Sequence, residues 1–346
     1  MPRNALLPVF FLLGISAMAS WHALEPSEEA GRTAAIQLGQ ALFEDRTLSA
    51  SGSMACASCH QREHAFAQNV AVPELYGERR GTRNVPSLLD LPYFESFFWD
   101  GRGTRLDLAV IAAFTNPAEM GSPDMDAVIH AISARKAYRE QFRAAFGDER
   151  VDQERVSSVL MSYLASLTTA GNRYDAFVAG DTTSLSEAER RGMEVFMGKA
   201  DCGSCHSATG KLAPFTDNRF HHSNVGLERM TGHVSETISA FKLRRESGSS
   251  MAELVLSDPE MAALGRFAVT SQGRDLAAYR TPTLRNISRT APYMHDGSVA
   301  TLEEAIRREI YYRSLARGAP ISLTAQEQRD LRAFLQALDD AALPTH

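Results

Sequence analysis

The pentapeptide Cys56-Ala57-Ser58-Cys59-His60 recurs as Cys202-Gly203-Ser204-Cys205-His206, and the two copies use all four cysteines of this 346-residue chain. In each copy, two thiols one helical turn apart are followed directly by a histidine. This pattern is typical of a covalent c-type haem site, in which both thiols form thioethers to one porphyrin and the histidine becomes the proximal iron ligand. We therefore expect two haem c groups. The predicted attachment residues are Cys56, Cys59 and His60 in the first copy and Cys202, Cys205 and His206 in the second.

Zinc binding and thiol redox chemistry are the other interpretations of a Cys-x-x-Cys pair, and both fit poorly. A structural zinc site wants four ligands, commonly with a second cysteine pair well downstream, whereas here each histidine directly follows its second cysteine. A thioredoxin-like pair would occur once, near a βαβ pattern that this sequence lacks. Because no cysteine is left over, a disulfide framework is not available either.

The N-terminal residues have the composition of a secretory signal, which agrees with the attachment of c-type haem outside the cytoplasm. Arg3 precedes an apolar stretch from Ala5 to Ala19 that closes on an A-x-A cleavage pattern. The stretch is short for a transmembrane helix, which needs about 20 residues. We expect residues 1–19 to be a cleaved signal peptide, with an uncleaved anchor as the alternative. The mature protein is then expected in the periplasm, without a membrane span.

An internal repeat indicates how the chain is divided. Leu38-Gly39-Gln40-Ala41-Leu42-Phe43 precedes the first haem motif, and Arg191-Gly192-Met193-Glu194-Val195-Phe196 precedes the second. Two cytochrome c-like modules in tandem are the natural inference. We expect an N-terminal domain over residues 30–170 that carries the first haem and a C-terminal domain over residues 185–340 that carries the second. The formal net charge of −6, without basic clusters interleaved with aromatics, gives no sign of a nucleic-acid partner.

Elsewhere the periodicity and the capping residues predict helices. A core-facing stripe at helical spacing is formed by Val156, Val159, Leu160, Tyr163, Leu164 and Leu167. Capping boxes are expected at Ser186 with Glu189, Thr301 with Glu304, and Thr324 with Glu327. No convincing alternating strand pattern competes, so the predicted fold is all-α.

Several segments resemble one known family, in order, from about residue 30 to residue 340. They are Arg83-Asn84-Val85-Pro86, Phe98-Trp99-Asp100-Gly101-Arg102, Asn116-Pro117-Ala118-Glu119-Met120-Gly121, Thr283-Leu284-Arg285-Asn286 and Thr290-Ala291-Pro292-Tyr293-Met294-His295-Asp296-Gly297. They are similar to segments of the bacterial dihaem cytochrome c peroxidase and MauG family. The resemblance implies two tandem cytochrome c-like domains with the haems facing a shared interface.

The resemblance also assigns roles to single residues. Glu119 matches the distal carboxylate over the open face of the first haem, where it would move a proton between the two oxygens of peroxide. Trp99 matches the tryptophan that lies between the haems and relays electrons. Asn84, with the backbone carbonyls of Thr290 and Pro292, matches an all-oxygen calcium site completed by waters.

Three departures from the family pattern bear on function. Tyr76 stands where classical peroxidases have the histidine that blocks the first haem at rest, which implies a permanently open haem as in the MauG branch. Ala109 replaces a glutamine near the distal carboxylate, so a less polar distal pocket is expected. The distal ligand of the second haem, Met in the peroxidases and Tyr in MauG, is expected to be Glu309 or Tyr312, with Met294 and His295 as minor alternatives.

The function expected from the sequence is that of a periplasmic dihaem peroxidase. Its first haem would reduce hydrogen peroxide with electrons relayed through the second haem from a small redox protein. The first alternative is a MauG-like oxidase that modifies a Trp or Tyr of a partner protein. The second alternative is a non-enzymatic electron carrier, which Glu119 over an open iron argues against, because a carrier needs no distal acid.

Overall fold

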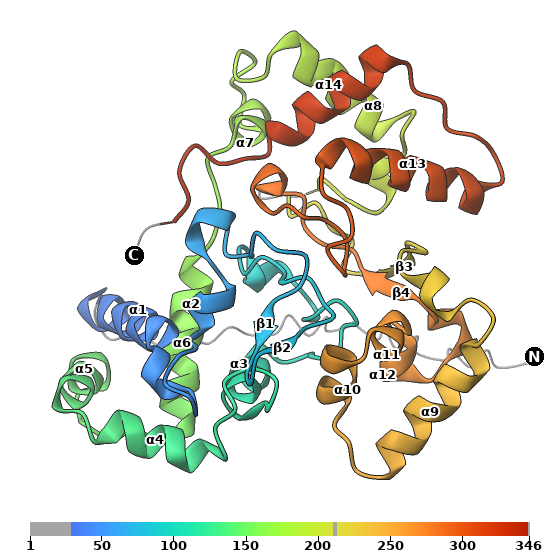
Figure 1. Ribbon diagram of the computed structural model, residues 1–346. Coiled ribbons are helices and arrows are strands. Elements are labelled where there is room, and N and C mark those ends of the chain that lie inside the picture. The colour runs from blue at the N-terminus through green and yellow to red at the C-terminus, as the bar shows by residue number, and fades with distance from the viewer. Residues whose placement is uncertain (1–28, 210–212, 345–346) are drawn as a thin grey trace, which may run out of the picture.

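The computed structural model describes residues 29–209 and 213–344, and over these ranges the chain is mostly helical (Figure 1). The predicted signal peptide at residues 1–19 lies outside the described residues. The helices are α1 Glu29–Glu44, α2 Cys56–Cys59, α3 Leu106–Thr115, α4 Met125–Ser133, α5 Lys136–Phe146, α6 Gln153–Ser166, α7 Arg173–Val178, α8 Glu187–Met197, α9 Val234–Glu246, α10 Met251–Ser257, α11 Pro259–Ala263, α12 Phe267–Thr270, α13 Leu302–Arg317 and α14 Ala325–Gln336.

Two small antiparallel ribbons interrupt the helices and refine the all-α prediction, which otherwise is confirmed. Strand β1 Glu74–Leu75 pairs with β2 Arg79–Arg80, and β3 Phe220–His222 pairs with β4 Ala278–Arg280. With two or three residues each, these strands are too short to show an alternating pattern in the sequence. Within the described residues, no helix combines the length and the apolar character needed to cross a membrane.

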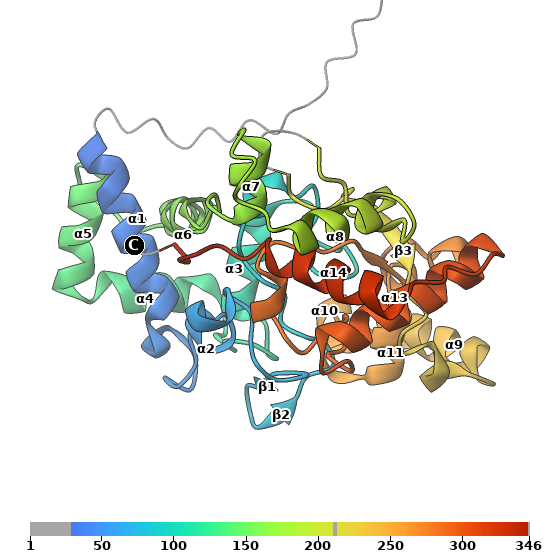
Figure 2. The same cartoon turned by 90° about the horizontal axis from the view of Figure 1, so that it is seen from above.

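Buried apolar side chains gather in three clusters. The first is built on α1 and α3–α6, and the second on α7, α8, α13 and α14. The third, built mainly on α9–α12, comes from an insertion between β3 and β4 that the sequence did not reveal. Figures 1 and 2 show α1 and α5 at one end of the molecule and α9 at the other. The predicted domain boundaries stay a prediction.

The internal repeat reappears as a repeated helix crossing. Helix α1 packs on α6, and α8 packs on α14. A methyl group at Gly39 would lie 2.0 Å from the carbonyl oxygen of Val159, and one at Gly192 would lie 1.9 Å from that of Asp330. Each glycine therefore allows the backbones of two helices to approach closely at an equivalent place in the repeat.

The predicted stripe on α6 and two of the three capping boxes are confirmed. All six stripe residues are buried. Reciprocal capping bonds join Ser186 with Glu189 and Thr324 with Glu327. At α13 the box is wrong: Thr301 accepts a hydrogen bond from the Glu304 backbone, but the Glu304 carboxylate lies 3.2 Å from an Arg308 nitrogen instead. The ion pair one turn along the helix holds this carboxylate away from the helix N-terminus.

A buried charge network ties the first and second clusters together. The Arg285 side chain has no solvent exposure, and its Nε donates to Thr169 Oγ1 at 2.7 Å. Its Nη1 donates to Asp175 Oδ1 at 3.0 Å. The Asp90 carboxylate, 3.6 Å from Arg285 Nε, also accepts from Thr169. The network connects the loop before α3 with α7 and with the segment that follows β4, and so fixes how the two halves are placed.

Candidate active site

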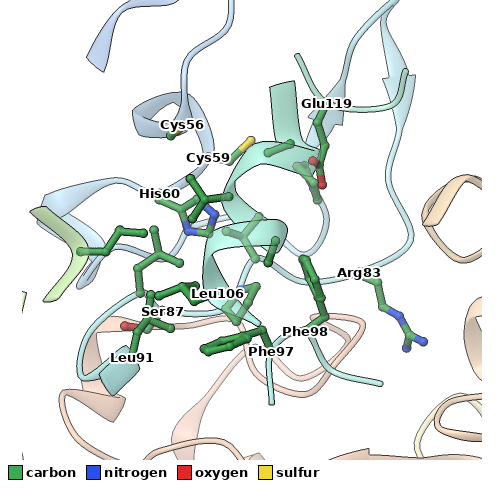
Figure 3. A pocket seen from close by; sticks show the side chains of 18 of the residues that line it. Cys56, Cys59, His60, Arg83, Ser87, Leu91, Phe97, Phe98, Leu106 and Glu119 are labelled. Carbon is green, nitrogen blue, oxygen red and sulfur yellow. The ribbon is translucent and has the colours of Figure 1, made fainter. Parts of the chain in front are cut away.

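The first haem motif opens onto a large cavity. Its volume is about 1450 Å³, its mouth included, and its wall contains Cys56, Cys59 and His60 together with Glu119. Figure 3 shows His60 and Glu119 projecting into this space from different segments of the chain. The His60 Nδ1 atom lies 3.0 Å from the carbonyl oxygen of Phe66, which accepts its hydrogen. The Nε2 lone pair is therefore available to a ligand.

The second haem motif repeats this geometry. Its cavity of about 1690 Å³, mouth included, is lined by Cys202, Cys205 and His206. The His206 Nδ1 atom lies 2.9 Å from the carbonyl oxygen of Phe215. Burial lowers the pKa of His206 and brings that of His60 to about 4, so both imidazoles are neutral. A neutral imidazole with its Nδ1 hydrogen engaged is the usual state of a histidine that ligates a metal.

These features fit haem c better than they fit a thiolate metal site. Burial raises the pKa of Cys56 to about 12 and that of Cys59 to about 11, which keeps both sulfurs as thiols. A zinc site needs thiolates. Ligand atoms of Cys205, Asp217 and His221 do lie within 4.8 Å of one another. The pKa of Cys205 is lowered, because against burial the hydrogen bond and charge of His221 favour its thiolate. Haem attachment would convert this sulfur to a thioether and so remove it as an anionic ligand.

Glu119 lies on the loop after α3 and is held by hydrogen bonds of that loop. Its backbone nitrogen donates to the Asn116 carbonyl at 2.9 Å, and Asn116 Oδ1 accepts from the Ala118 backbone at 3.0 Å. Burial raises the pKa of Glu119, although the Arg102 charge and a hydrogen bond from Asn116 oppose the shift. The carboxyl group therefore exchanges a proton closer to neutral pH than an exposed glutamate does.

Arg102 is a residue of this cavity to which sequence reasoning gave no role. Its Nη1 donates to both carboxylate oxygens of Asp100, at 3.1 and 3.0 Å, and its guanidinium lies 3.8 Å from the centre of the Phe98 ring. The side chain is thereby fixed in the cavity wall. The predicted loss of polarity at Ala109 is thus offset by a cation, although Ala109 itself lines the cavity beside Val110 and Ala113.

Trp99 lies in the wall that the two cavities share. It lines both of them, and its Nε1 donates to the Asn84 carbonyl at 2.8 Å. Its own carbonyl accepts from the Arg280 backbone at 2.9 Å. The other residues common to both walls are Asn84, Val85, Pro86, Ser87 and Arg280. Trp99 therefore borders both cavities, and its role as an electron relay stays a prediction.

The three residues of the expected calcium site lie around one cavity. Asn84, Thr290 and Pro292 all line the second cavity. The Asn84 Nδ2 donates at 3.3 Å to the carbonyls of Val70 and Ala71, which leaves Oδ1 as its metal-ligating atom. Calcium binding by these residues stays a prediction.

The Tyr76 side chain lies outside the first cavity. Its ring is within 3.4 Å of the position of a methyl group on Gly121, and its backbone nitrogen donates to the Ala118 carbonyl at 3.2 Å. The preceding residue, Leu75, is buried in the third cluster. The segment is thus anchored by packing on both sides, and Tyr76 is not among the residues that face His60.

Helix α13 presents one face to the second cavity. The residues on this face are Leu302, Ala305, Ile306, Glu309, Ile310 and Arg313, and Tyr312 is not part of it. Burial raises the pKa of Glu309, against the charges of Arg313 and His221. Met294 and His295 also line the cavity, but His295 is stacked on Tyr279 with ring centres 3.6 Å apart.

The third cluster contributes to the site in a way that the sequence did not indicate. Leu256 of α10 lines the first cavity, although it follows the second haem motif in the chain. The insertion is held against the first half by the Arg83 Nη2, which donates to the Ala262 carbonyl at 2.5 Å. No local motif marks such a contact, because it depends on how distant segments pack.

Comparison with known proteins agrees with this geometry. A family model for di-haem cytochrome c peroxidase matches residues 33–183. The methylamine utilization protein MauG of Methylophilus methylotrophus is 31% identical over 317 residues, covering 88% of this chain and 82% of that protein. The cytochrome c551 peroxidase of Nitrosomonas europaea is 29% identical, covering 78% of this chain and 71% of that protein.

A solved structure shares the fold over nearly the whole chain. The crystal structure of a MauG-like protein associated with microbial copper homeostasis superposes with a TM-score of 0.70 at 29% identity, covering 89% of this chain and 90% of that one. Together with the two cysteine-histidine motifs and their cavities, these similarities show that the chain belongs to the di-haem cytochrome c peroxidase and MauG family and is a dihaem oxidoreductase.

Proposed function

We propose that the protein is a periplasmic peroxidase that reduces hydrogen peroxide to water at an open first haem, with electrons relayed through the second. The observation that carries the proposal is the wall of the first cavity, where His60 and Glu119 both line the space and Trp99 borders the second cavity. A proximal ligand, a distal acid and a route for electrons are thus provided by three separate segments. The periplasmic location rests on the signal expected at residues 1–19.

Haem, when bound, supplies an iron that takes up peroxide and accepts electrons. Reduction of one peroxide consumes two electrons and two protons and yields two waters. The Glu119 carboxylate would accept a proton from one peroxide oxygen and return it to the other, which then leaves as water. Its raised pKa favours both transfers near neutral pH, and the Arg102 cation stabilises the carboxylate form that exists before the first transfer and after the second.

The position of Tyr76 supports a first haem that is accessible at rest. The Tyr76 side chain does not line the first cavity, whereas its neighbour Leu75 does, and the Tyr76 backbone is held by its hydrogen bond to the Ala118 carbonyl. We therefore propose that no reductive activation step is needed. The electron donor in this scheme is a small redox protein that reduces the second haem.

We propose Glu309 as the distal ligand of the second haem. It is the carboxylate on the α13 face that lines the second cavity, whereas Tyr312 lies off that face. With Glu309 and His206 holding a haem, the anionic oxygen of Glu309 would stabilise the oxidised iron, whereas a methionine would raise the reduction potential. Met294 and His295 remain the minor alternatives.

The same observations favour a second candidate function, that of a MauG-like oxidase acting on a Trp or Tyr of a partner protein. An accessible first haem and an oxygen ligand on the second both suit an enzyme that shares oxidising equivalents between two haems. Hydrogen peroxide is the oxidant in both schemes. They differ in the source of electrons, a small redox protein in one and a side chain of the substrate protein in the other.

The experiment that tests the proposal has two parts. Intact mass of the purified protein should correspond to two covalent haems, and Cys56→Ala and Cys202→Ala should each disrupt one attachment site. Rapid mixing of the ferric protein with peroxide should then give a prompt spectral change without added reductant. A mass that fits one haem, or a reaction that begins only after reduction, contradicts the proposal.

Steady-state turnover separates the two candidate functions. A peroxidase consumes peroxide continuously when a reduced cytochrome c is supplied, with two donor molecules oxidised per peroxide. A MauG-like oxidase should instead hold its oxidised spectrum in the presence of that donor until its substrate protein is added.

A further inference from the structure

Arg280, at the end of β4, is a buried cation without an anionic partner in the described part of the chain. Its exposed fraction is 7%. Its Nη1 donates to the Thr281 carbonyl at 3.3 Å, and its guanidinium lies 4.6 Å from the centre of the Phe94 ring. Its Nε has no hydrogen-bond partner. Burial of an unpaired charge is strongly unfavourable, so the site implies an anion that completes it.

The other two buried arginines of the described residues, Arg83 and Arg285, and the half-buried Arg102 each have a carboxylate within 4.0 Å. Arg285 is paired with Asp90 and Asp175, Arg102 with Asp100, and Arg83 lies 4.0 Å from Asp100. Among ion pairs within 4.0 Å in the described ranges, Arg280 takes no part. Burial alone lowers the pKa of Arg280, to about 10, which leaves it charged at neutral pH. Arg83 likewise has two nitrogens, Nε and Nη1, without a hydrogen-bond partner, but it has a carboxylate within 4.0 Å, whereas Arg280 has none within the described residues.

The location of Arg280 identifies the anion by its chemistry. The residue lines both cavities, in the shared wall that also contains Trp99 and Asn84. None of the four cysteines belongs to this shared wall. Thioethers hold one edge of each porphyrin at its cysteines, and the two propionates lie on the opposite edge of the ring. Carboxylates from either haem can thus approach the shared wall.

The backbone around Arg280 fixes the side chain between the two sites. Its nitrogen donates to the Trp99 carbonyl at 2.9 Å, and β4 pairs Arg280 with Phe220 of β3. The position of the Arg280 side chain is consequently tied to that of Trp99 by this backbone hydrogen bond. A planar guanidinium offers five donor hydrogens, enough to engage carboxylates on two sides at once.

We propose that the Arg280 guanidinium binds haem propionate at the wall shared by the two cavities and acts as a common positioning residue for both haems. A single cation near both propionate groups keeps them ionised and raises the reduction potential of both irons. The two sites are then linked electrostatically through one side chain. The inference rests on the proposed attachment of two haems, which the intact mass checks separately.

The test compares Arg280→Gln with Arg274→Gln, both measured as holoprotein with two haems by mass. Arg274 is exposed and lines neither cavity, so the substitution Arg274→Gln removes the same unit of charge away from both sites. Spectroelectrochemical titration at several pH values should show that Arg280→Gln lowers both midpoint potentials. It should also make them more dependent on pH near neutrality, because an unpaired propionate takes up a proton on reduction. Arg274→Gln should match the wild type.

Unchanged potentials in Arg280→Gln, or a shift confined to one haem, would overturn the proposal. Arg280→Lys retains the charge but not the planar guanidinium with its paired donors. This variant replaces Arg280→Gln in the test if the glutamine variant does not accumulate. Its resonance Raman propionate bending bands should shift for both haems, and unshifted bands count against the proposal. Wild-type potentials that respond to inorganic phosphate at constant ionic strength would indicate a solution anion at Arg280 and would also overturn it.

Discussion

Glu119 shows how one side chain acquires its chemistry from its surroundings. A glutamate in water has a pKa of roughly 4.3, too low to hold a proton for long at neutral pH. At the end of α3, burial raises the pKa of Glu119, while the Arg102 charge limits the shift. The two opposing effects leave a group that can both accept and return a proton.

We predict that Glu119→Gln retains both haems but cleaves peroxide roughly 100-fold more slowly, the usual scale for loss of a positioned acid–base group. Glutamine keeps the size of the side chain and removes the exchangeable proton. Stopped-flow mixing with peroxide measures the rate. Glu74→Gln is the matched control, because Glu74 is exposed on β1 and should leave the rate unchanged.

The same variant gives a second readout in the pH profile. The reaction needs the carboxylate form at its start, so the wild-type rate should fall as the pH drops through the raised pKa of Glu119. The acid limb should therefore lie at a higher pH than an exposed glutamate would give, and Glu119→Gln should lack it. An acid limb that survives in the variant assigns the titration to another group.

The orientation of helix α13 about its own axis decides which of its residues face the second cavity. Both Glu309 and Tyr312 fit the spacing of a ligand, since they lie one turn apart. Packing of Leu302, Ala305 and Ile306 against the second cavity turns Glu309 toward it. The apolar residues of α13 thus place the Glu309 side chain in the wall of the second cavity.

We predict that Glu309→Ala converts the second haem from low spin to high spin, because its distal position loses the proposed ligand. Tyr312→Phe should retain the low-spin signal. Electron paramagnetic resonance of the ferric proteins measures both. A high-spin second haem in Tyr312→Phe would transfer the ligand role to Tyr312, and an unchanged signal in both variants would exclude this helix as the source.

The crossing of α8 and α14 yields a prediction at the same scale. By helix propensity alone, Gly192→Ala should stabilise the protein by about 1 kcal/mol. The added methyl would lie 1.9 Å from the Asp330 carbonyl oxygen, so the helices must separate. Overpacking of this kind typically destabilises a protein by about 1–3 kcal/mol. We take the upper end of this range, because the methyl group would meet backbone atoms, and subtract the gain from helix propensity. We predict a net destabilisation of about 2 kcal/mol, measured by denaturant unfolding of the holoprotein.

Glu194→Ala is the control for this variant, because Glu194 is exposed on the same helix. Its effect on the free energy of unfolding should be within about 0.5 kcal/mol, as for most surface substitutions. A Gly192→Ala protein as stable as the wild type would contradict the prediction, because it would show that α8 and α14 can move apart without a decrease in the free energy of unfolding.

For the molecule as a whole, the two halves meet at a wall made by both. Trp99 and Asn84 come from the first half and Arg280 from the second, and backbone hydrogen bonds join Arg280 to Trp99 and Asn84 to His295. The C-terminal residues add to this connection, since Arg62 donates to the carbonyls of Leu343 and Pro344 at 3.1 and 2.9 Å. The chain thus returns to the first half after completing the second.

We predict that Trp99→Phe spares the initial reaction with peroxide and slows electron exchange between the haems. Phenylalanine keeps an apolar ring in the wall but is harder to oxidise and loses the hydrogen bond to the Asn84 carbonyl. Single-turnover kinetics after reduction of the second haem measure the exchange. An exchange rate equal to that of the wild type would remove Trp99 from the electron path.

The sequence by itself determined the features whose chemistry is local in the chain. The haem motifs place two thiols and an imidazole within five residues, so their function needs no distant partner. The capping box at Ser186 and the α6 stripe depend on residues three or four positions apart, and the structure confirms both. The box at Thr301 was wrong because Arg308, one turn further, competes for Glu304.

Only the tertiary structure decided which side chains share a cavity. Helical spacing allows Glu309 and Tyr312 equally, and the packing of α13 places Glu309, not Tyr312, in the wall of the second cavity. Leu256 and Arg280 line the first cavity although both follow the second haem motif in the sequence, and no sequence pattern predicts this placement. The physical reason is the same in each case: burial and charge pairing depend on the arrangement of distant segments, which local periodicity does not encode.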